Sequence, residues 1–117
     1  MKEAEAYHGP SLIIGYAPCE MHGIKKGGMQ NCQQEMKKAV EAGYWHMFRY
    51  NPTAEANKLT IDSKEPTADY QAFIANEARY ARLAASFPER AKALFEKAEE
   101  AAKAKYERLL KMAKLYE

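Results

Sequence analysis

The chain has 117 residues and a formal net charge of +2, and charged residues make up 29% of it. Its length fits one domain at most, and its composition is that of an ordinary soluble protein, not a disordered or fibrous one. Acidic and basic residues are interleaved and no run approaches the ~20 apolar residues that span a bilayer, so neither a nucleic-acid-binding patch nor a membrane segment is predicted. Cys19 and Cys32, in a chain that begins without a secretory leader, argue for reduced thiols in the cytoplasm.

The first predicted elements are a short helix and a buried strand. Residues 2–7 have the pattern of a helix that begins upstream, and the Gly-Pro pair at 9–10 ends it. Residues 11–17 follow as a strand. The apolar residues 12–14 are consecutive rather than alternating, which is typical of a strand buried on both faces of a parallel sheet.

The next elements are a glycine-rich loop at 20–30 and a helix from residue 31 or 32 to 42. Gly43 supplies a left-handed stop at the end of that helix. The aromatic segment 44–50 is predicted to be a strand, and the alternating segment 58–62 a short edge strand. Strand, helix and strand within about forty residues predict a right-handed crossover unit.

The second half of the chain is predicted to be helical. After Pro66, residues with helical spacing continue to Phe87, and Glu77 recurs at the same spacing as the apolar ones. Pro88 then begins another helix as a first-turn proline. The segment 89–116 is predicted to be an amphipathic helix of about seven turns that packs one narrow apolar stripe against something larger.

Cys19 is the main candidate functional residue. It follows the predicted strand directly, after Pro18 and before Gly23, where the loops of an α/β sheet gather cofactors and metals. Thiolates ligate iron–sulfur clusters and zinc, usually four to a site. His22 offers a weak second ligand, and no other pair completes a metal motif. The spacing therefore leaves two interpretations open, a metal ligand or a buried free cysteine that packs as a small hydrophobe.

The other candidate residues favour structural roles. Cys32 stands at a predicted helix start in a capping position, with Asn31 as the alternative cap because cysteine caps poorly, although thiols at such positions can be reactive. His8 and His46 are interpreted as surface or packing histidines. Arg49 lies between two aromatic residues, where it stacks on a ring or pairs with an acid; a structural ion pair is favoured.

Several segments then occur in order along the chain, from the first strand to the helical tail. They are residues 5–14 (EAYHGPSLII), 16–23 (YAPCEMHG), 38–45 (KAVEAGYW), 49–52 (RYNP), 59–66 (LTIDSKEP) and 77–80 (EARY). Together they resemble the thiamine-diphosphate domain of pyruvate:ferredoxin (flavodoxin) oxidoreductases, and the resemblance covers essentially the whole chain.

This resemblance implies a fold and a division of the chain. It implies an α/β fragment of a thiamine-diphosphate-binding three-layer fold, with two or three strands and a crossover helix, followed by two C-terminal helices of which the last is long. Residues 1–66 would be the C-terminal part of the thiamine-diphosphate and cluster-binding α/β domain, and residues 67–117 a helical extension of it. The chain would be a C-terminal fragment of a longer polypeptide, inactive alone.

The resemblance also implies a function for the intact enzyme. Such an enzyme oxidatively decarboxylates pyruvate to acetyl-CoA on thiamine diphosphate and Mg²⁺, and passes electrons through [4Fe–4S] clusters to ferredoxin or flavodoxin. Cys19 would be one ligand of the cluster nearest the thiamine, with the other ligands outside this chain. A cytoplasmic homodimer of anaerobic metabolism, using coenzyme A, is implied. No catalytic or cofactor-binding role is transferred to any other residue.

The chain departs from the family pattern near the expected cluster. Glu20 and Met21 stand where the family commonly has an apolar residue and an asparagine, which puts polar contacts beside the cluster in question. Cys32 stands where serine is common, which supports its interpretation as a cap.

Two other functions remain open. In a non-enzymatic α/β interaction module, the aromatic strand around Trp45 and the helix at 94–116 would bind a partner, and Cys19 would only be buried. In a related 2-oxoacid:ferredoxin oxidoreductase, the substrate would be a different acid, and no residue of this segment identifies it.

Overall fold

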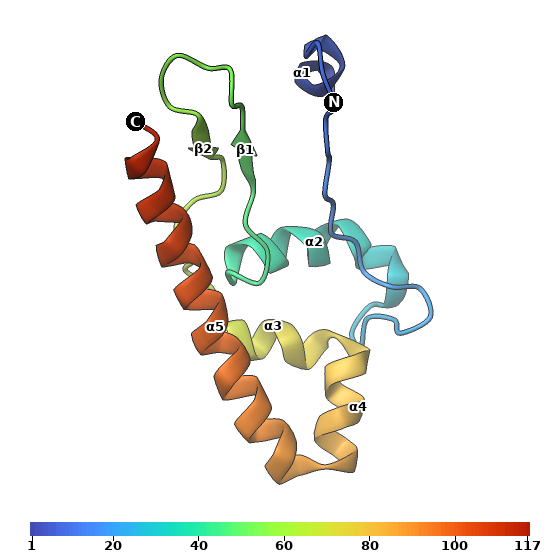
Figure 1. Cartoon of the computed structure of the whole chain (residues 1–117). Helices are drawn as coiled ribbons and strands as arrows, with labels where there is room; N and C mark the ends of the chain where they lie inside the picture. Colours follow the sequence, from blue (N-terminus) through green and yellow to red (C-terminus); the bar gives the residue numbers. More distant parts are fainter.

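The computed structural model describes residues 1–117 as a mostly helical chain with one small sheet. Its elements in chain order are helix α1 (Lys2–Ala6), the 3-10 helix η1 (Gly28–Asn31), helix α2 (Cys32–Glu41), strands β1 (Phe48–Tyr50) and β2 (Leu59–Ile61), and helices α3 (Tyr70–Asn76), α4 (Ala78–Ser86) and α5 (Pro88–Leu115) (Figure 1). The predicted mixed α/β class with a long C-terminal helix is thus confirmed. None of these helices combines the length and the apolar character needed to cross a membrane.

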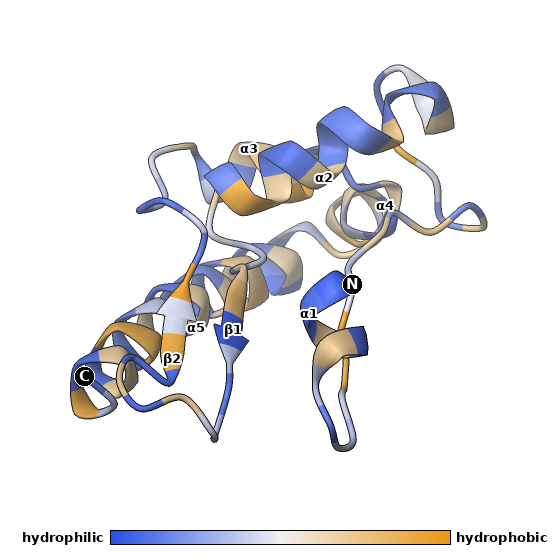
Figure 2. Ribbon diagram, turned by 90° about the horizontal axis from the view of Figure 1, so that it is seen from above, coloured by the Kyte–Doolittle hydropathy of each residue, from blue (hydrophilic) through white to orange (hydrophobic).

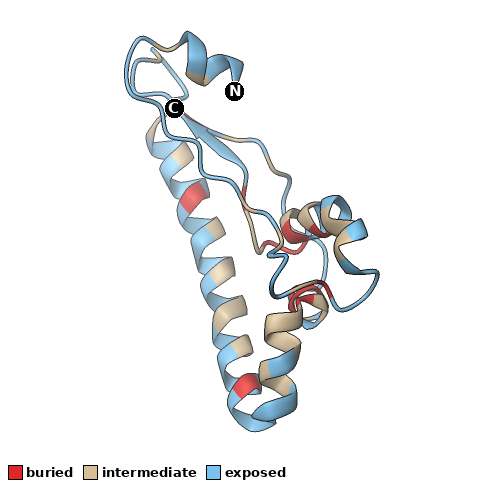
Figure 3. Ribbon diagram, turned by 90° about the vertical axis from the view of Figure 1, so that its right-hand side faces the viewer, coloured by how far each residue is buried: buried red, intermediate tan, exposed pale blue.

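The molecule is elongated. Its principal extents are 50 × 29 × 22 Å and its radius of gyration is 16.6 Å, whereas a globular domain of this length has a radius near ~13 Å. Buried residues number 13 of 117. Figure 3 shows most of them where α2 and α3 meet and two more along α5, while α1 and the segment after it are exposed.

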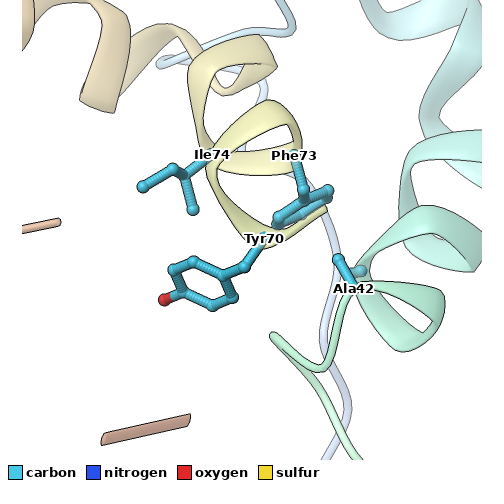
Figure 4. Close-up of a cluster of buried hydrophobic side chains, with 5 residues drawn as sticks. Ala42, Tyr70, Phe73 and Ile74 are labelled. Carbon is cyan, nitrogen blue, oxygen red and sulfur yellow. The ribbon is translucent and has the colours of Figure 1, made fainter. Parts of the chain in front are cut away.

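The core lies between the end of α2 and α3. Its buried side chains are Ala39, Ala42, Tyr70, Phe73 and Ile74 (Figure 4). Gly43 ends α2 with a φ of +76°, as predicted, because glycine enters the left-handed region without the clash of a Cβ. At the start of α3, the Asp69 carboxylate accepts hydrogen bonds from the backbone N–H groups of Gln71 and Ala72.

The predicted strand at residues 11–17 is wrong for this structure. The segment is extended, but no backbone hydrogen bond involves residues 11–18, so it belongs to no sheet. Leu12, Ile13 and Ile14 are 84%, 60% and 69% exposed. A strand needs a neighbouring backbone to complete its hydrogen bonds, and no strand within residues 1–117 pairs with this one. Figure 2 shows the run as a coil next to α1.

The sheet is an antiparallel hairpin, so the predicted crossover unit is also wrong. β1 pairs with β2 in the register Phe48↔Ile61, Arg49↔Thr60 and Tyr50↔Leu59. The predicted strands at 44–50 and 58–62 are confirmed in shortened form, but they pair with each other instead of with residues 11–17. Leu59 is buried, and the apolar residues of β2 lie beside α5 (Figure 2).

The predicted single helix between Pro66 and Phe87 is two helices. The helix is interrupted at Glu77, whose backbone is extended (φ −79°, ψ 118°), so α3 and α4 meet at an angle (Figure 1). Glu77 instead forms an isolated antiparallel bridge with Ile24. Pro88 begins α5, as predicted, and α5 continues for 28 residues.

Candidate functional site

Cys19 lies in an exposed loop between the extended segment 11–17, called the arm from here on, and the β-bridge at Ile24. The Cys19 loop is defined here as residues 17–23. Its thiol is free and solvent-exposed, so the interpretation of Cys19 as a buried packing residue is wrong. The Gly23 N–H donates to the Cys19 carbonyl oxygen over 2.8 Å, and Gly23 has a φ of +77°. The loop therefore closes on itself by a turn that favours glycine, with the thiol left accessible.

Both ends of the Cys19 loop contact the α3–α4 junction, defined as residues 76–78. Before the loop, the Tyr16 hydroxyl donates to Glu77 Oε1 over 2.7 Å. After it, the Lys25 and Lys26 N–H groups donate to the Asn76 backbone oxygen (2.8 Å) and to Asn76 Oδ1 (3.1 Å). The Ala78 N–H donates to the Gly23 carbonyl oxygen over 3.2 Å. One short segment thus contacts the chain on both sides of the cysteine, through the Tyr16 side chain before it and through the backbone of residues 23–26 after it.

Two buried carboxylates support this junction. Glu77 is 2% exposed and Glu35, on α2, is 1% exposed. The Asn76 amide nitrogen donates to Glu35 Oε2 over 3.0 Å, which links α2 to the end of α3. Buried charged groups are rare unless they are hydrogen-bonded, so this pair indicates a structural or functional constraint beside the loop.

The Tyr16 hydroxyl contacts Glu77, and the Tyr16 ring packs against Tyr44. The pKa of Tyr16 is raised well above its ordinary value of 10.0. Burial is the largest cause, and the hydrogen bond to Glu77 is the second. The pKa of Tyr44 is also raised, mainly by burial and then by the hydrogen bond with Tyr80. The Arg79 guanidinium donates to the Tyr44 oxygen over 2.6 Å. These phenols therefore stay protonated at neutral pH, and Tyr16 remains a hydrogen-bond donor.

The sequence alone did not identify Tyr16, Glu35, Asn76 or Glu77 as site residues. A signal was available for Glu77, because a carboxylate recurred among apolar residues at helical spacing. For the others the signal is tertiary, since their partners lie far away along the chain.

The other candidate residues from the sequence lie outside this site, and some of them have structural roles. Cys32 is a free, half-buried thiol at the start of α2 and is not paired with Cys19. His22 and His8 are exposed. Arg49 forms the predicted ion pair, with Asp62 at 2.8 Å and Glu3 at 2.7 Å, and these two bonds raise its pKa.

His46 is a packing histidine, one of the two roles predicted for it. Its ring stacks on Tyr106 with a centroid separation of 5.1 Å, and burial lowers its pKa. It lines a cavity of about 350 Å³ beside α5, and a second cavity of about 440 Å³ lies between α4 and α5. Cys19 lines neither of them.

The donor set of these residues fits one ligand of a metal cluster and no more. No group of three or more His, Cys, Asp or Glu side chains is placed to hold a metal ion. Cys19 presents an accessible sulfur on a loop whose backbone is held, which suits a thiolate ligand. A four-thiolate cluster fits here if the other three sulfurs come from outside these residues.

The relatives of this chain are oxidoreductases. It is 52% identical to the pyruvate:ferredoxin oxidoreductase of Moorella thermoacetica and 47% identical to the pyruvate-flavodoxin oxidoreductase of Klebsiella pneumoniae, each over 114 residues and 95% of the chain. It is 40% identical to the mitochondrial pyruvate dehydrogenase [NADP(+)] of Euglena gracilis over 89 residues, 74% of the chain. No protein-family model matches it.

The match is to pyruvate oxidoreductases in particular. The chain spans about a tenth of the Moorella and Klebsiella enzymes, at 10% of each, and 5% of the Euglena protein. It thus corresponds in sequence to a small segment of a pyruvate:ferredoxin or pyruvate-flavodoxin oxidoreductase, as the resemblance predicted.

Proposed function

We propose that this chain is part of a pyruvate oxidoreductase that oxidatively decarboxylates pyruvate to acetyl-CoA and passes electrons to ferredoxin or flavodoxin. The observation that carries the proposal is the identity of 47–52% over 95% of the chain to enzymes of that name. The alternative of a non-enzymatic interaction module is not favoured, because an independent binding module has no reason to keep such similarity along its whole length to these enzymes.

Cys19 would bind one iron of a [4Fe–4S] cluster, a group that accepts and passes on single electrons when bound. The accessible thiol and its held backbone support this role, since a ligand must keep its position as the cluster changes charge. The remaining three thiolates would come from the rest of the polypeptide. Thiamine diphosphate and Mg²⁺ would also be held there, because no residue of this chain is assigned to them.

The exposure of the arm is an argument that further polypeptide covers it in a larger protein. Leu12, Ile13 and Ile14 expose apolar area next to unpaired backbone, a combination that soluble proteins rarely leave uncovered. Residues 11–17 would become a strand when segments of the remaining polypeptide pair with them. The division into an α/β part (1–66) and a helical extension (67–117) is proposed from the similarity to the pyruvate oxidoreductases, as is a cytoplasmic homodimer that uses coenzyme A.

A chimera tests this function. The matching 114-residue segment of the Moorella enzyme is replaced by this chain, and Cys19→Ala is compared with Cys32→Ala as a matched control. We expect Cys19→Ala to lower the iron content and to change the electron paramagnetic resonance spectrum of the reduced protein, because one cluster loses a ligand. Cys32→Ala should change neither. Unchanged iron and an unchanged spectrum in Cys19→Ala would refute the proposal.

The isolated chain should be inactive. It supplies at most one of four cluster ligands and no assigned thiamine site. Pyruvate-dependent reduction of an acceptor by the chain alone, after cofactors are added, would contradict this expectation.

A further inference from the structure

The break between α3 and α4 has no local cause in the sequence. Residues 70–86 contain neither proline nor glycine, the usual causes of sharp helix interruption. The backbone groups released by the break are used elsewhere. The Asn76 carbonyl accepts from Lys25, and the Ala78 N–H donates to Gly23. The tertiary contact with the segment after Cys19 therefore compensates for the interruption of the helix.

The side chains of the junction hold the same segment. Glu77 Oε1 accepts from Tyr16 before the Cys19 loop, and Asn76 Oδ1 accepts from Lys26 after it. Asn76 is itself fixed by Glu35 of α2. A carboxylate that accepts a hydrogen bond from a phenol makes a stronger hydrogen bond than a neutral pair does, because the charge assists it.

The ring of Tyr16 is also fixed. It packs on Tyr44 and Trp45, with centroid separations of 5.4 Å and 6.0 Å. The end of the arm is thus attached to the core through an aromatic contact and one hydrogen bond. By contrast, residues 11–14 make no such contact and are exposed. The chain becomes ordered against the core at Tyr16, three positions before the cysteine.

We propose that Glu77 is a positioning residue for Cys19, acting through Tyr16 and through the backbone bridge to Ile24. This inference rests on the proposed function, because positioning matters if Cys19 binds a cluster. Glu77 would not touch the cluster. Its carboxylate would fix the start of the Cys19 loop through Tyr16, while the flanking Asn76 and Ala78 fix the other end by backbone hydrogen bonds. The thiolate would then meet the iron without first ordering the loop, and outer groups of this kind tune both affinity and spectrum.

The first test uses the 117-residue chain and hydrogen exchange read by mass spectrometry. In the unaltered chain we expect the amides of residues 23–26 to be protected. In Glu77→Gln and in Tyr16→Phe they should exchange about tenfold faster, while the exchange rates of α2 stay the same. Tyr16→Phe keeps the ring packing and removes only the hydroxyl, so it serves if Glu77→Gln unfolds the chain. The control is Glu99→Gln, since Glu99 accepts from Gln71 and pairs with Lys103 in α5, away from the loop.

Two results would overturn the inference at this stage. One is unprotected exchange of residues 23–26 in the unaltered chain. The other is exchange in Tyr16→Phe that equals that of Glu99→Gln. Neither result depends on a cluster, so the test of the loop geometry is separate from the test of function.

The second test uses the chimera with the Moorella enzyme. We expect Glu77→Gln and Tyr16→Phe to release iron to a chelator about tenfold faster and to alter the resonance spectrum of one reduced cluster, with Glu99→Gln unchanged. If Cys19→Ala removes a cluster but neither Glu77→Gln nor Tyr16→Phe alters iron release or the spectrum, the inference fails and the proposed function stands. If Cys19→Ala has no effect, the proposed function itself fails.

Discussion

Two regions of this molecule bury apolar residues very differently. Ile74, on α3, is 1% exposed and lies in the cluster that joins α2 and α3, whereas Ile13, in the arm, is 60% exposed. The arm carries the longest bulky apolar run of the chain, yet it is the least covered part. Burial is therefore not a property of the residue type alone, because it also requires a second element to supply the opposing surface.

The two regions differ because only one of them satisfies its own backbone hydrogen bonds. α2 and α3 pack because each presents apolar side chains at helical spacing, and each satisfies its own backbone hydrogen bonds. The arm cannot do so, since an extended backbone must pair with another strand. Residues 11–17 thus depend on a partner that residues 18–117 do not provide.

The largest expected loss of stability comes from a substitution in the packed region. Ile74→Ala should lower the free energy of unfolding by about 2–5 kcal/mol, because it leaves a cavity in the core. Ile13→Ala, the matched change in the arm, should stay within about 0.5 kcal/mol. Urea unfolding followed by circular dichroism measures both. Equal losses for the two variants would show that the arm is packed in solution and would contradict the contrast.

A smaller effect distinguishes two glycines. Gly43→Ala should cost about 1–2 kcal/mol, since φ is +76° there and a Cβ would approach the ring of Pro66 to 3.0 Å. Gly15→Ala, in the arm, meets nothing within 4 Å and should change stability by less than about 0.5 kcal/mol. Thermal unfolding compares them. A larger loss for Gly15→Ala would indicate a close contact in the arm.

The smallest effect depends on pH and involves two histidines. Burial lowers the pKa of His46 below its ordinary value of 6.5. The unfolded chain therefore binds more protons than the folded chain below about pH 6.5, so stability should be full above that pH and fall as the pH decreases. His46→Gln should flatten the profile of unfolding free energy between pH 7 and 5, relative to the unaltered chain. His8→Gln, at an exposed position before the arm, is the control, and an equally flattened profile in that variant would contradict the assignment of the effect to His46.

Predictions from the sequence succeeded where the cause was local. The stop at Gly43 follows from the freedom of glycine at positive φ, and the start of α5 at Pro88 follows from the missing proline N–H. Predictions failed where the cause was a distant partner. The interruption at Glu77 was missed because the helical spacing continues through it and Ile24 lies far away in the sequence.

The same distinction between local and distant causes applies to the candidate site. Cys19 was identifiable from its position after an apolar run and before glycine, and the ordered segments that resemble pyruvate oxidoreductases were readable without a structure. The supporting residues were not. Glu35 meets Asn76 only when α2 packs near α3, and Tyr16 meets Glu77 only when the arm contacts the α3–α4 junction. Their charges and hydroxyls have ordinary surface interpretations until the packing is known.

The amino-acid sequence by itself determined the mixed helix-and-strand class, the long last helix and the single cysteine worth testing, because spacing, proline and glycine act on neighbouring residues. Only the tertiary structure decided that the strands pair as a hairpin, that the apolar arm is bare and that Glu77 interrupts a helix to contact the Cys19 loop. Those outcomes depend on which hydrogen-bonding and apolar surfaces meet across the fold, and that is a competition among distant segments.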